Sequence, residues 1–328
     1  MSDEKHFDKA VQAVSKELRC MLYDIDRDIK KKCFEVRLRV NNPVSLVCSD
    51  GIFYLGLNGE ILHSSENTYI VTSDVISDTF SRICDYSVYT YHTDILNGFV
   101  TVDGGHRAGI CGTAVCNTDG TLKSVRNVTS VNIRIAREIK GCSEKLFSDG
   151  SCDLGESIIV AGPPSGGKTT LIRDMVRLIS DSGKKVCLID ERREIACVHK
   201  GAPQMDVGIN TDIYSDYPKT KAINMALRTM SPGVIAVDEV CDFSEIEAIR
   251  YAANSGISFI VSLHARSYDD LLKRIMCVSL IKTDTFDKLI LLDENRNYQI
   301  FNVGELRDEI YRCRSSLVGF SDFRDDIF

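Results

Sequence analysis

The sequence of 328 residues lacks several features that would place it in a common class of protein. No apolar run approaches the ~18 residues that a membrane-spanning helix needs, so any membrane role would have to come through a partner. No Cys-x-x-Cys pair occurs, which argues against a zinc site. Basic residues are not in excess: 40 Lys and Arg stand against 47 Asp and Glu, for a formal net charge of −7. This balance argues against a general nucleic-acid coat, although it allows a local basic patch.

Cysteine, in contrast, is abundant but scattered. The chain has 13 cysteines, an odd number, at irregular spacings. No secretory signal peptide precedes them. We therefore expect reduced and mostly buried thiols in a cytoplasmic protein.

The order of apolar patterns predicts two domains. Residues 2–25 carry apolar side chains at spacings of three and four, which is typical of a helix with a core-facing stripe. Strand patterns with hairpin turns follow, and residues 73–97 between them are expected to be helical. From about residue 151, apolar strands alternate with helices of ten or more residues, which indicates parallel βαβ units. We expect a mixed α+β domain over 1–145 and an α/β domain with a parallel sheet over 146–328.

A phosphate-binding loop is the most informative motif. The run from Gly162 to Thr169 fits G-x-x-x-x-G-K-[ST] at every fixed position, between a buried strand pattern and a helix pattern. In that context, backbone N–H groups and the positive end of the helix surround a phosphate. Lys168 would reach the β- and γ-phosphates of ATP, and the Thr169 hydroxyl would hold Mg²⁺. The expected nucleotide-binding residues are Gly162, Pro163, Pro164, Ser165, Gly166, Gly167, Lys168, Thr169 and Thr170.

Acidic residues end two further strand patterns, and a histidine ends a third. Asp238 and Glu239 follow the apolar run 234–237, as in a Walker B strand, so Asp238 would hold Mg²⁺ and Glu239 would deprotonate the attacking water. Asp190 and Glu191 end the run 186–189, where they would join the Mg²⁺ site, hold arginines, or form a plain charged strand end. His264 would either sense the γ-phosphate or serve as a structural histidine.

An arginine from another part of the molecule is a further expectation, because phosphoryl transfer depends on charge stabilisation. The predicted first domain has several arginines on strands. Either they reach a neighbour's nucleotide or they form a solvated face. The candidates are Arg37, Arg39, Arg107, Arg134 and Arg137, of which Arg107, Arg134 and Arg137 are taken forward as catalytic.

These motifs together resemble a known family. The order of phosphate loop, acidic strand end, Asp-Glu strand and Ser-Leu-His is similar to the RecA-like ATPases of type II and type IV secretion and pilus machines. The segment Asn97–Gly112, with its Gly-Gly-His-Arg core, closely resembles the stage III sporulation protein AA family. The runs 36–39, 132–138 and 186–195 match the same family, and the resemblance extends from about residue 30 to 265.

The resemblance implies a RecA-like ATPase of the mother-cell cytoplasm in an endospore-forming bacterium. It further implies a homo-oligomer, a hexamer, at the base of a channel to the forespore, with membrane proteins of that channel as partners. One departure is that Val240-Cys241-Asp242 stands where relatives have a Gly-Arg element. Two other functions stay open: a nucleic-acid-stimulated ATPase, which the acidic balance disfavours, and a slowly hydrolysing assembly scaffold, which Glu239 disfavours.

Overall fold

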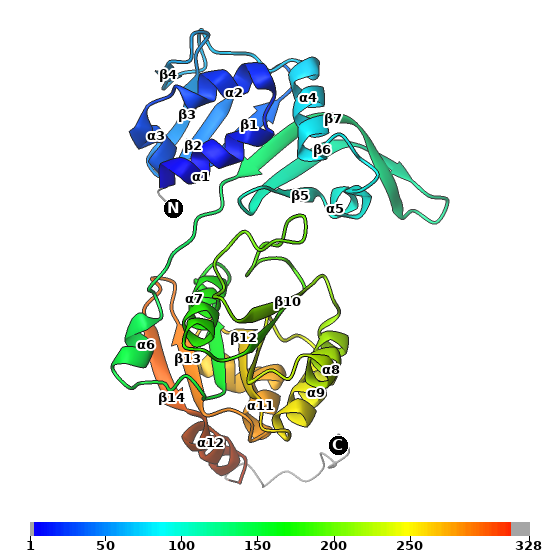
Figure 1. The fold of residues 1–328 in the computed structure, drawn as a ribbon. Coiled ribbons are helices and arrows are strands. Elements are labelled where there is room, and N and C mark those ends of the chain that lie inside the picture. Colours follow the sequence, from blue (N-terminus) through cyan, green and yellow to red (C-terminus); the bar gives the residue numbers. More distant parts are fainter. Residues whose placement is uncertain (1–2, 316–328) are drawn as a thin grey trace. The chain divides into compact units, whose positions relative to one another are not determined.

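A computed structural model describes residues 3–315. The chain divides into two compact units (Figure 1). Unit 1 comprises residues up to Glu138 together with a segment from much later in the sequence, Cys197–Met205, which we call the strap. Unit 2 comprises Ile139–Ala196 and the residues from Asp206 onward. The division falls between Glu138 and Ile139, ahead of the boundary expected at 145/146, and the strap was not anticipated.

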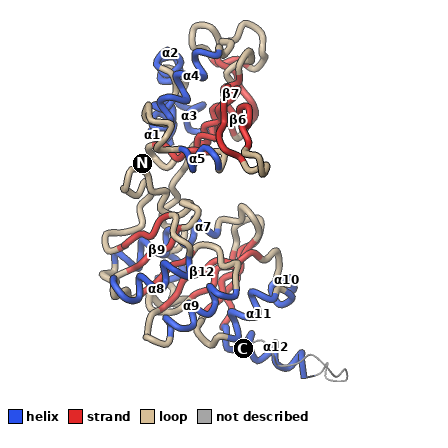
Figure 2. Tube along the Cα trace, turned by 90° about the vertical axis from the view of Figure 1, so that its right-hand side faces the viewer, coloured by secondary structure: helices blue, strands red, loops and turns tan. Residues whose placement is uncertain are grey.

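Unit 1 is an antiparallel sheet with helices on one face (Figure 2). The strand order is β4-β3-β2-β1-β7-β6-β5. Its helices, which include one 3-10 helix (η1), are α1 (Asp3–Ala10), η1 (Val11–Ala13), α2 (Lys16–Tyr23), α3 (Arg27–Lys32), α4 (Ser73–Ile83) and α5 (His92–Leu96). Its strands are β1 (Cys33–Arg39), β2 (Ser45–Cys48), β3 (Gly51–Leu55), β4 (Ile61–Leu62), β5 (Phe99–Val102), β6 (His106–Cys116) and β7 (Leu122–Arg134).

The apolar stripe at the N-terminus is core-facing, as predicted, but the helix that carries it is broken. Phe7, Val14 and Leu22 are all fully buried. The backbone turns extended at Val14 and Ser15, and the Ser15 N–H donates to Thr79 Oγ1 at 3.1 Å instead of continuing a helix. A tertiary hydrogen bond has therefore replaced a helical one at this point, while the buried face is kept.

The strands of unit 1 alternate between an apolar face and a face that carries arginines. Val36 and Leu38 are fully buried, so Arg37 and Arg39 point to the other side of the sheet. The register places Arg107 opposite Arg134, and Arg134 opposite Glu35. Four arginines thus share the sheet face opposite to the core: Arg37, Arg39, Arg107 and Arg134.

Unit 2 is a sheet in the order β10-β9-β11-β12-β8-β13-β14, parallel except for β14. Its strands are β8 (Ile158–Gly162), β9 (Val186–Asp190), β10 (Thr211–Ser215), β11 (Val234–Val237), β12 (Ser258–His264), β13 (Lys288–Leu292) and β14 (Tyr298–Asn302). Its helices are α6 (Glu144–Ser148), α7 (Lys168–Asp181), α8 (Lys219–Thr229), α9 (Phe243–Ala253), α10 (Tyr268–Lys273), α11 (Ile275–Lys282) and α12 (Val303–Ser315). The parallel βαβ pattern expected from about residue 151 is confirmed.

The central strands of unit 2 are buried on both faces, which is why they read as continuous apolar runs. Alternate strand residues form one core with α8, α9, α11 and α12. The intervening residues face the other way, where α7 buries Ile172, Met175 and Val176. Parallel strands bring their carboxyl ends to one edge of the sheet, and this edge carries the candidate site.

The strap packs against the rest of unit 1 at two consecutive glycines, Gly104 and Gly105. The Gly104 N–H donates to Gln204 Oε1 at 2.7 Å. Gly105 has φ +73°, and a Cβ placed there would come within 2.8 Å of Met205 Cε and 2.9 Å of Cys197 Cβ. Lys200 pairs with Asp85 at 2.7 Å. The chain therefore passes between the two units three times, at 138/139, 196/197 and 205/206.

Two expectations about the whole chain can be checked within the described residues. Among residues 3–315, no helix combines the length and the apolar character needed to cross a membrane. Twelve of the thirteen cysteines have described side chains; all twelve are free thiols and seven are buried, as the packing role predicted.

Candidate functional site

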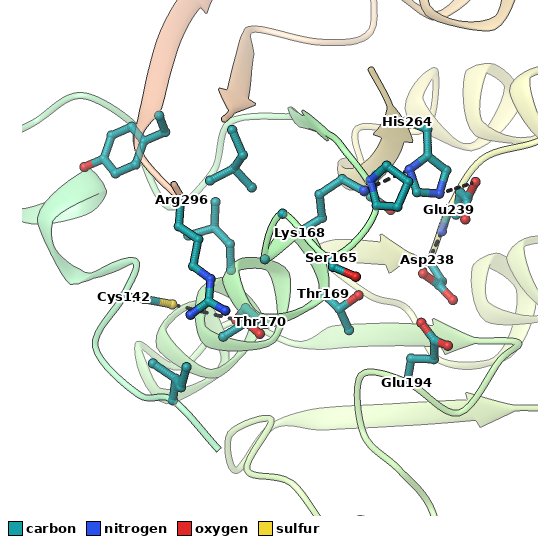
Figure 3. Close-up of a pocket in the computed structure, with 18 of the residues that line it drawn as sticks. Cys142, Ser165, Lys168, Thr169, Thr170, Glu194, Asp238, Glu239, His264 and Arg296 are labelled. Carbon is teal, nitrogen blue, oxygen red and sulfur yellow. Dashed lines mark hydrogen bonds and ion pairs between the residues drawn. The ribbon is translucent and has the colours of Figure 1, made fainter. Parts of the chain in front are cut away.

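The phosphate loop joins the end of β8 to the start of α7. Ser165 (φ +60°) and Gly167 (φ +95°) take left-handed backbone conformations, which fold the loop back over the helix N-terminus. No acidic side chain occupies the first turn of α7, so its exposed N–H groups and positive dipole end are available to an anion. The loop lines a cavity of about 480 Å³, and every residue from Pro164 to Leu171 contributes to it (Figure 3).

Lys168 has its ammonium folded onto the loop itself. Its Nζ donates to the carbonyl oxygens of Gly162 at 3.0 Å and Pro163 at 2.8 Å, and lies 3.0 Å from His264 Nδ1. The residue is only 8% exposed, and burial lowers the pKa of this ammonium. The carbonyl groups of the loop itself therefore surround the ammonium in this structure.

His264 links the phosphate loop to the acidic pair after β11. Its Nε2 lies 2.9 Å from Glu239 Oε1, and the other carboxylate oxygen of Glu239 accepts from Arg192 Nη1 at 2.9 Å. The expected Lys168, His264 and Glu239 thus form one connected chain of hydrogen bonds, visible in Figure 3. Register explains the contact: His264 pairs with Gly162 across β12 and β8, so the end of one strand faces the start of the loop.

Asp238 is the residue best placed to hold a cation. It is 4% exposed, its Oδ1 accepts the Glu239 N–H at 2.8 Å, and its Oδ2 is buried with no partner among the described residues. Burial, together with the nearby charges of Asp190 and Glu194, raises the pKa of this carboxyl. Figure 3 shows Asp238 and Glu194 facing each other near the Thr169 hydroxyl. An unpaired buried oxygen beside a second carboxylate and a hydroxyl fits Mg²⁺, which keeps most of its water ligands.

Asp190 and Glu191, expected as possible Mg²⁺ ligands, bind other groups in the structure. Asp190 is fully buried, and its two oxygens accept the backbone N–H groups of Glu194, Ile195 and Ala196 at 2.8–3.2 Å. Burial raises the pKa of Asp190, while those hydrogen bonds act in the opposite direction. Glu191 pairs instead with Lys219 at 3.2 Å. Neither lines the cavity, so we correct that assignment: Asp190 shapes the loop that presents Glu194.

The same loop is fixed from the other side by α7. Arg173 is 7% exposed and donates to the carbonyl oxygens of Ile195 at 2.6 Å and Glu194 at 2.7 Å. Glu194 therefore reaches the cavity from a loop whose N–H groups are held by Asp190 and whose carbonyls are held by Arg173. Glu194 and Arg192 were not among the predicted site residues, although both lie in the run 186–195 that carries the family resemblance.

The three arginines expected to be catalytic differ in availability within unit 1. Arg134 has 69% of its side chain exposed and one ion pair, to Glu35 at 3.4 Å. Arg107 lies over the Phe99 ring at 4.8 Å and is half-buried. Arg137 donates to the carbonyl oxygens of Lys31 and Cys33 and lies over the Phe34 ring at 5.0 Å. Arg137 is thus bound into its own unit, and its catalytic role stays a prediction.

No cluster of three or more His, Cys, Asp or Glu side chains suited to a metal occurs among residues 3–315. A transition-metal centre is therefore not found in this part of the chain. The two-residue set of Thr169 and Asp238, with water completing the shell, is the arrangement expected for Mg²⁺ bound together with a nucleotide.

The chain matches the family model described as "Sporulation stage III, protein AA" over residues 4–312. It is 37% identical over 264 residues to "Stage III sporulation protein AA" of Bacillus subtilis (strain 168), covering 79% of this chain and 81% of that protein. The chain therefore belongs to the stage III sporulation protein AA family.

Solved structures show the fold. The pilus retraction motor PilT with bound ADP aligns with a TM-score of 0.59 at 18% identity, over 87% of this chain and 85% of that one. The Legionella pneumophila ATPase DotB aligns with a TM-score of 0.53 at 15% identity, over 92% of this chain and 87% of that one. The expected RecA-like fold of the secretion ATPases is confirmed.

Proposed function

With membership of this family as the premise, we propose that the chain hydrolyses ATP with Mg²⁺ at the cavity around the phosphate loop. The observation that carries the proposal is the connected chain from Lys168 through His264 to Glu239, which joins a phosphate-binding cation to a carboxylate base. A scaffold that only bound nucleotide would not need the hydrogen bond between His264 and Glu239.

In this mechanism the phosphate loop binds the triphosphate and Lys168 exchanges its carbonyl partners for β- and γ-phosphate oxygens. Thr169 and Asp238 would hold Mg²⁺, which neutralises charge on the phosphate oxygens. Glu239 orients a water molecule and accepts its proton. For Glu239 to do so, one of its two oxygens must leave its present partner, either Arg192 or His264.

The site is completed by an arginine from a second copy of the chain. Arg134 is the best candidate because it is the most exposed of the expected three and stands on an arginine-bearing sheet face. An arginine supplied in this way typically raises the hydrolysis rate by about 10³–10⁵-fold. The active form is then a closed homo-oligomer, six copies being the number that the resemblance implies.

The biological role that fits is transport or assembly at a channel between mother cell and forespore. The protein would lie in the mother-cell cytoplasm and reach the membrane through membrane proteins of that channel. Hydrolysis would change the contacts made in the ATP and ADP states and so drive a shift between them.

Three variants test this function by phosphate release and ATP binding in the assembled protein. Lys168→Ala should lose ATP binding, Glu239→Gln should retain ATP without splitting it, and Arg134→Ala should lower hydrolysis more than binding. Hydrolysis that survives Glu239→Gln at the wild-type rate would contradict the role of Glu239. Intact hydrolysis in Arg134→Ala would contradict the shared site.

The arginine-bearing face of unit 1 also favours a second candidate, a nucleic-acid-stimulated ATPase. Arg37, Arg39, Arg107 and Arg134 share that face, with Glu35 as the acidic side chain paired in register. Single-stranded DNA or RNA that raises the turnover, with an effect that falls steeply with salt, would support this candidate over the transport role.

A further inference from the structure

The cavity of unit 2 has a polar end and a second end of different chemistry. At the polar end stand Lys168, Asp238, Glu239, Glu194 and His264. The other end is lined by Ile139, Cys142, Leu292, Arg296 and Tyr298. Figure 3 shows Arg296 beside Thr170 and Cys142, on the side of the phosphate loop away from His264. A triphosphate held at the start of α7 must extend its nucleoside toward this second end.

Arg296 is presented by a tight turn between β13 and β14. The Asp293 N–H donates to the Asn297 carbonyl at 2.9 Å, and Asn297 donates from its backbone N–H and its amide to the two carboxylate oxygens of Asp293, at 2.8 and 3.1 Å. These bonds close the turn around Arg296 and fix its backbone. The turn is therefore organised before any ligand arrives.

The backbone of Arg296 is strained. Its φ is +66°, a left-handed conformation that glycine adopts freely and that other residues adopt at a cost. A three-residue hairpin turn requires this conformation at its last position, so the turn fixes where the Arg296 backbone lies.

The side chain of Arg296 lies over the phosphate loop and is unpaired. A Cβ placed on Gly167 would come 3.8 Å from Arg296 Cγ, so the arginine stem covers that glycine. Within the described part of the chain, its guanidinium has no hydrogen-bond or ion-pair partner, unlike Arg192 and Arg173 in the same unit. A planar cation is thus held free over the cavity.

The chemistry of this end suits the flat face of a nucleoside base. Guanidinium groups stack on aromatic rings, and Ile139, Leu292 and Tyr298 supply apolar surface around it. None of the five side chains at this end is a carboxylate or a carboxamide. Reading the edge of guanine requires acceptors for its N1 and N2 protons, and these side chains do not offer a pair of them.

We propose that Arg296, with Ile139 and Tyr298, holds the base of the bound nucleoside triphosphate by its face, so that the site accepts ATP and GTP alike. This assignment rests on the proposed function and adds its substrate class: nucleoside triphosphates, without selection between the two purines.

The test compares ligands with and without a base on the full chain in Mg²⁺. ATP, GTP and inorganic tripolyphosphate are titrated against the wild type, Arg296→Ala, Arg296→Lys and Glu294→Gln. Glu294 is exposed in the same turn and does not line the cavity, so its variant is the matched control. Loss of the stacked guanidinium should weaken ATP and GTP by about ten-fold each. Tripolyphosphate affinity should stay unchanged, Arg296→Lys should bind as weakly as Arg296→Ala, and KM rather than kcat should change.

A fourth variant separates binding from folding. Arg296→Gly relieves the positive φ, so it should raise the thermal unfolding midpoint by a few degrees while it weakens ATP and GTP as much as Arg296→Ala does. A variant that is better folded and binds worse cannot owe its defect to damage in the turn.

Several outcomes would overturn the assignment. Unchanged ATP affinity in Arg296→Ala would do so, as would an equal loss for tripolyphosphate, which would make Arg296 a phosphate ligand. If Arg296→Lys keeps the wild-type affinity for ATP and GTP, the positive charge of the side chain, and not stacking on the base, accounts for binding. A GTP affinity a hundred-fold below that of ATP would refute recognition by the face of the base alone. A wild-type chain that binds none of the three ligands would instead overturn the proposed function, and this assignment with it.

Discussion

His264 offers the sharpest test of the mechanism because its two ring nitrogens have different partners. Lys168 is a donor only, so Nδ1 of His264 must accept from it, at 3.0 Å. The proton of the neutral ring is then on Nε2, which donates to Glu239 Oε1 at 2.9 Å. A doubly protonated ring would face the Lys168 ammonium as a second cation. The geometry therefore assigns His264 the role of positioning Glu239 rather than that of a proton donor to phosphate.

The magnitude of the effect follows from the bond that is lost. A hydrogen bond to a charged group contributes about 1.5–3 kcal/mol, and the His264 side chain is 35% exposed, so the lower half of that range applies. We expect His264→Ala to lower kcat by about 10–40-fold. ATP affinity should change by less than about three-fold, because the loop amides and Lys168 remain. His264→Gln should recover part of the rate, since a side-chain amide can both accept and donate.

The assay is phosphate release at saturating ATP by the assembled protein, with ATP affinity measured separately. His63→Ala, an exposed histidine of unit 1, is the control for loss of an imidazole. In the Glu239→Gln background, His264→Ala should cost no further rate, because the two residues act as a unit. A full additional loss in the double variant would show that His264 acts on the phosphate independently of Glu239. An equal loss of ATP affinity and of kcat would refute the positioning role altogether.

Three further predictions concern the residues that support the two units. Arg137→Ala should destabilise unit 1 by about 2–3 kcal/mol in urea unfolding, because it removes the hydrogen bonds of the guanidinium to two backbone carbonyls. Arg134→Ala should change stability by less than about 0.5 kcal/mol, and equal effects would contradict the structural role of Arg137. His106 is fully buried beside His6, Lys9 and Asp103, and burial lowers its pKa to about 3. The stability contributed by the neutral ring is therefore complete above pH 6.5 and is lost as pH falls toward 3, by about 2–3 kcal/mol at pH 4.5. His106→Asn should flatten this pH dependence of urea unfolding, and an unchanged profile would count against the buried neutral ring. Asp190→Asn should lower the rate of hydrolysis by at least about ten-fold without abolishing ATP binding, because it weakens the hydrogen bonds that hold the loop presenting Glu194. An unchanged rate would show that this loop does not depend on Asp190.

The site was predictable where residues follow strands of a parallel sheet. Lys168, Asp238 and His264 come after three different apolar runs, and the strand order β11-β12-β8 brings those ends together at one edge. The phosphate loop also carries its own local signal, because glycines, a lysine and a threonine at fixed spacing are needed to surround a phosphate. Such predictions need only a local sequence pattern and the rule that parallel strands bring their carboxyl ends to one edge of the sheet.

Roles that depend on a particular side-chain rotamer or on distant partners were not predictable. The sequence cannot show that Asp190 turns away from the cavity to bind the amides of residues 194–196, because an acid at a strand end reads the same in either case. Arg296 follows the turn residues Asp293–Asn295 with no motif around it, and only the positive φ and the neighbouring Gly167 reveal its place. The break in the N-terminal helix likewise depends on Thr79, far along the chain.

The strap explains a requirement for glycine in the Gly-Gly-His-Arg segment, which carries the family resemblance. Gly104 and Gly105 read as an ordinary turn, yet Gly104 donates to Gln204, and a side chain at 105 would meet Met205 and Cys197. The requirement for glycine at position 105 is thus set by a segment from the other half of the chain, whereas a side chain at 104 would meet His106 and Lys9. That segment begins one peptide bond after Ala196, whose N–H is held by Asp190 in the loop that presents Glu194 to the cavity. Asp190 and Arg173 therefore fix the backbone of this loop up to the residue that precedes the strap.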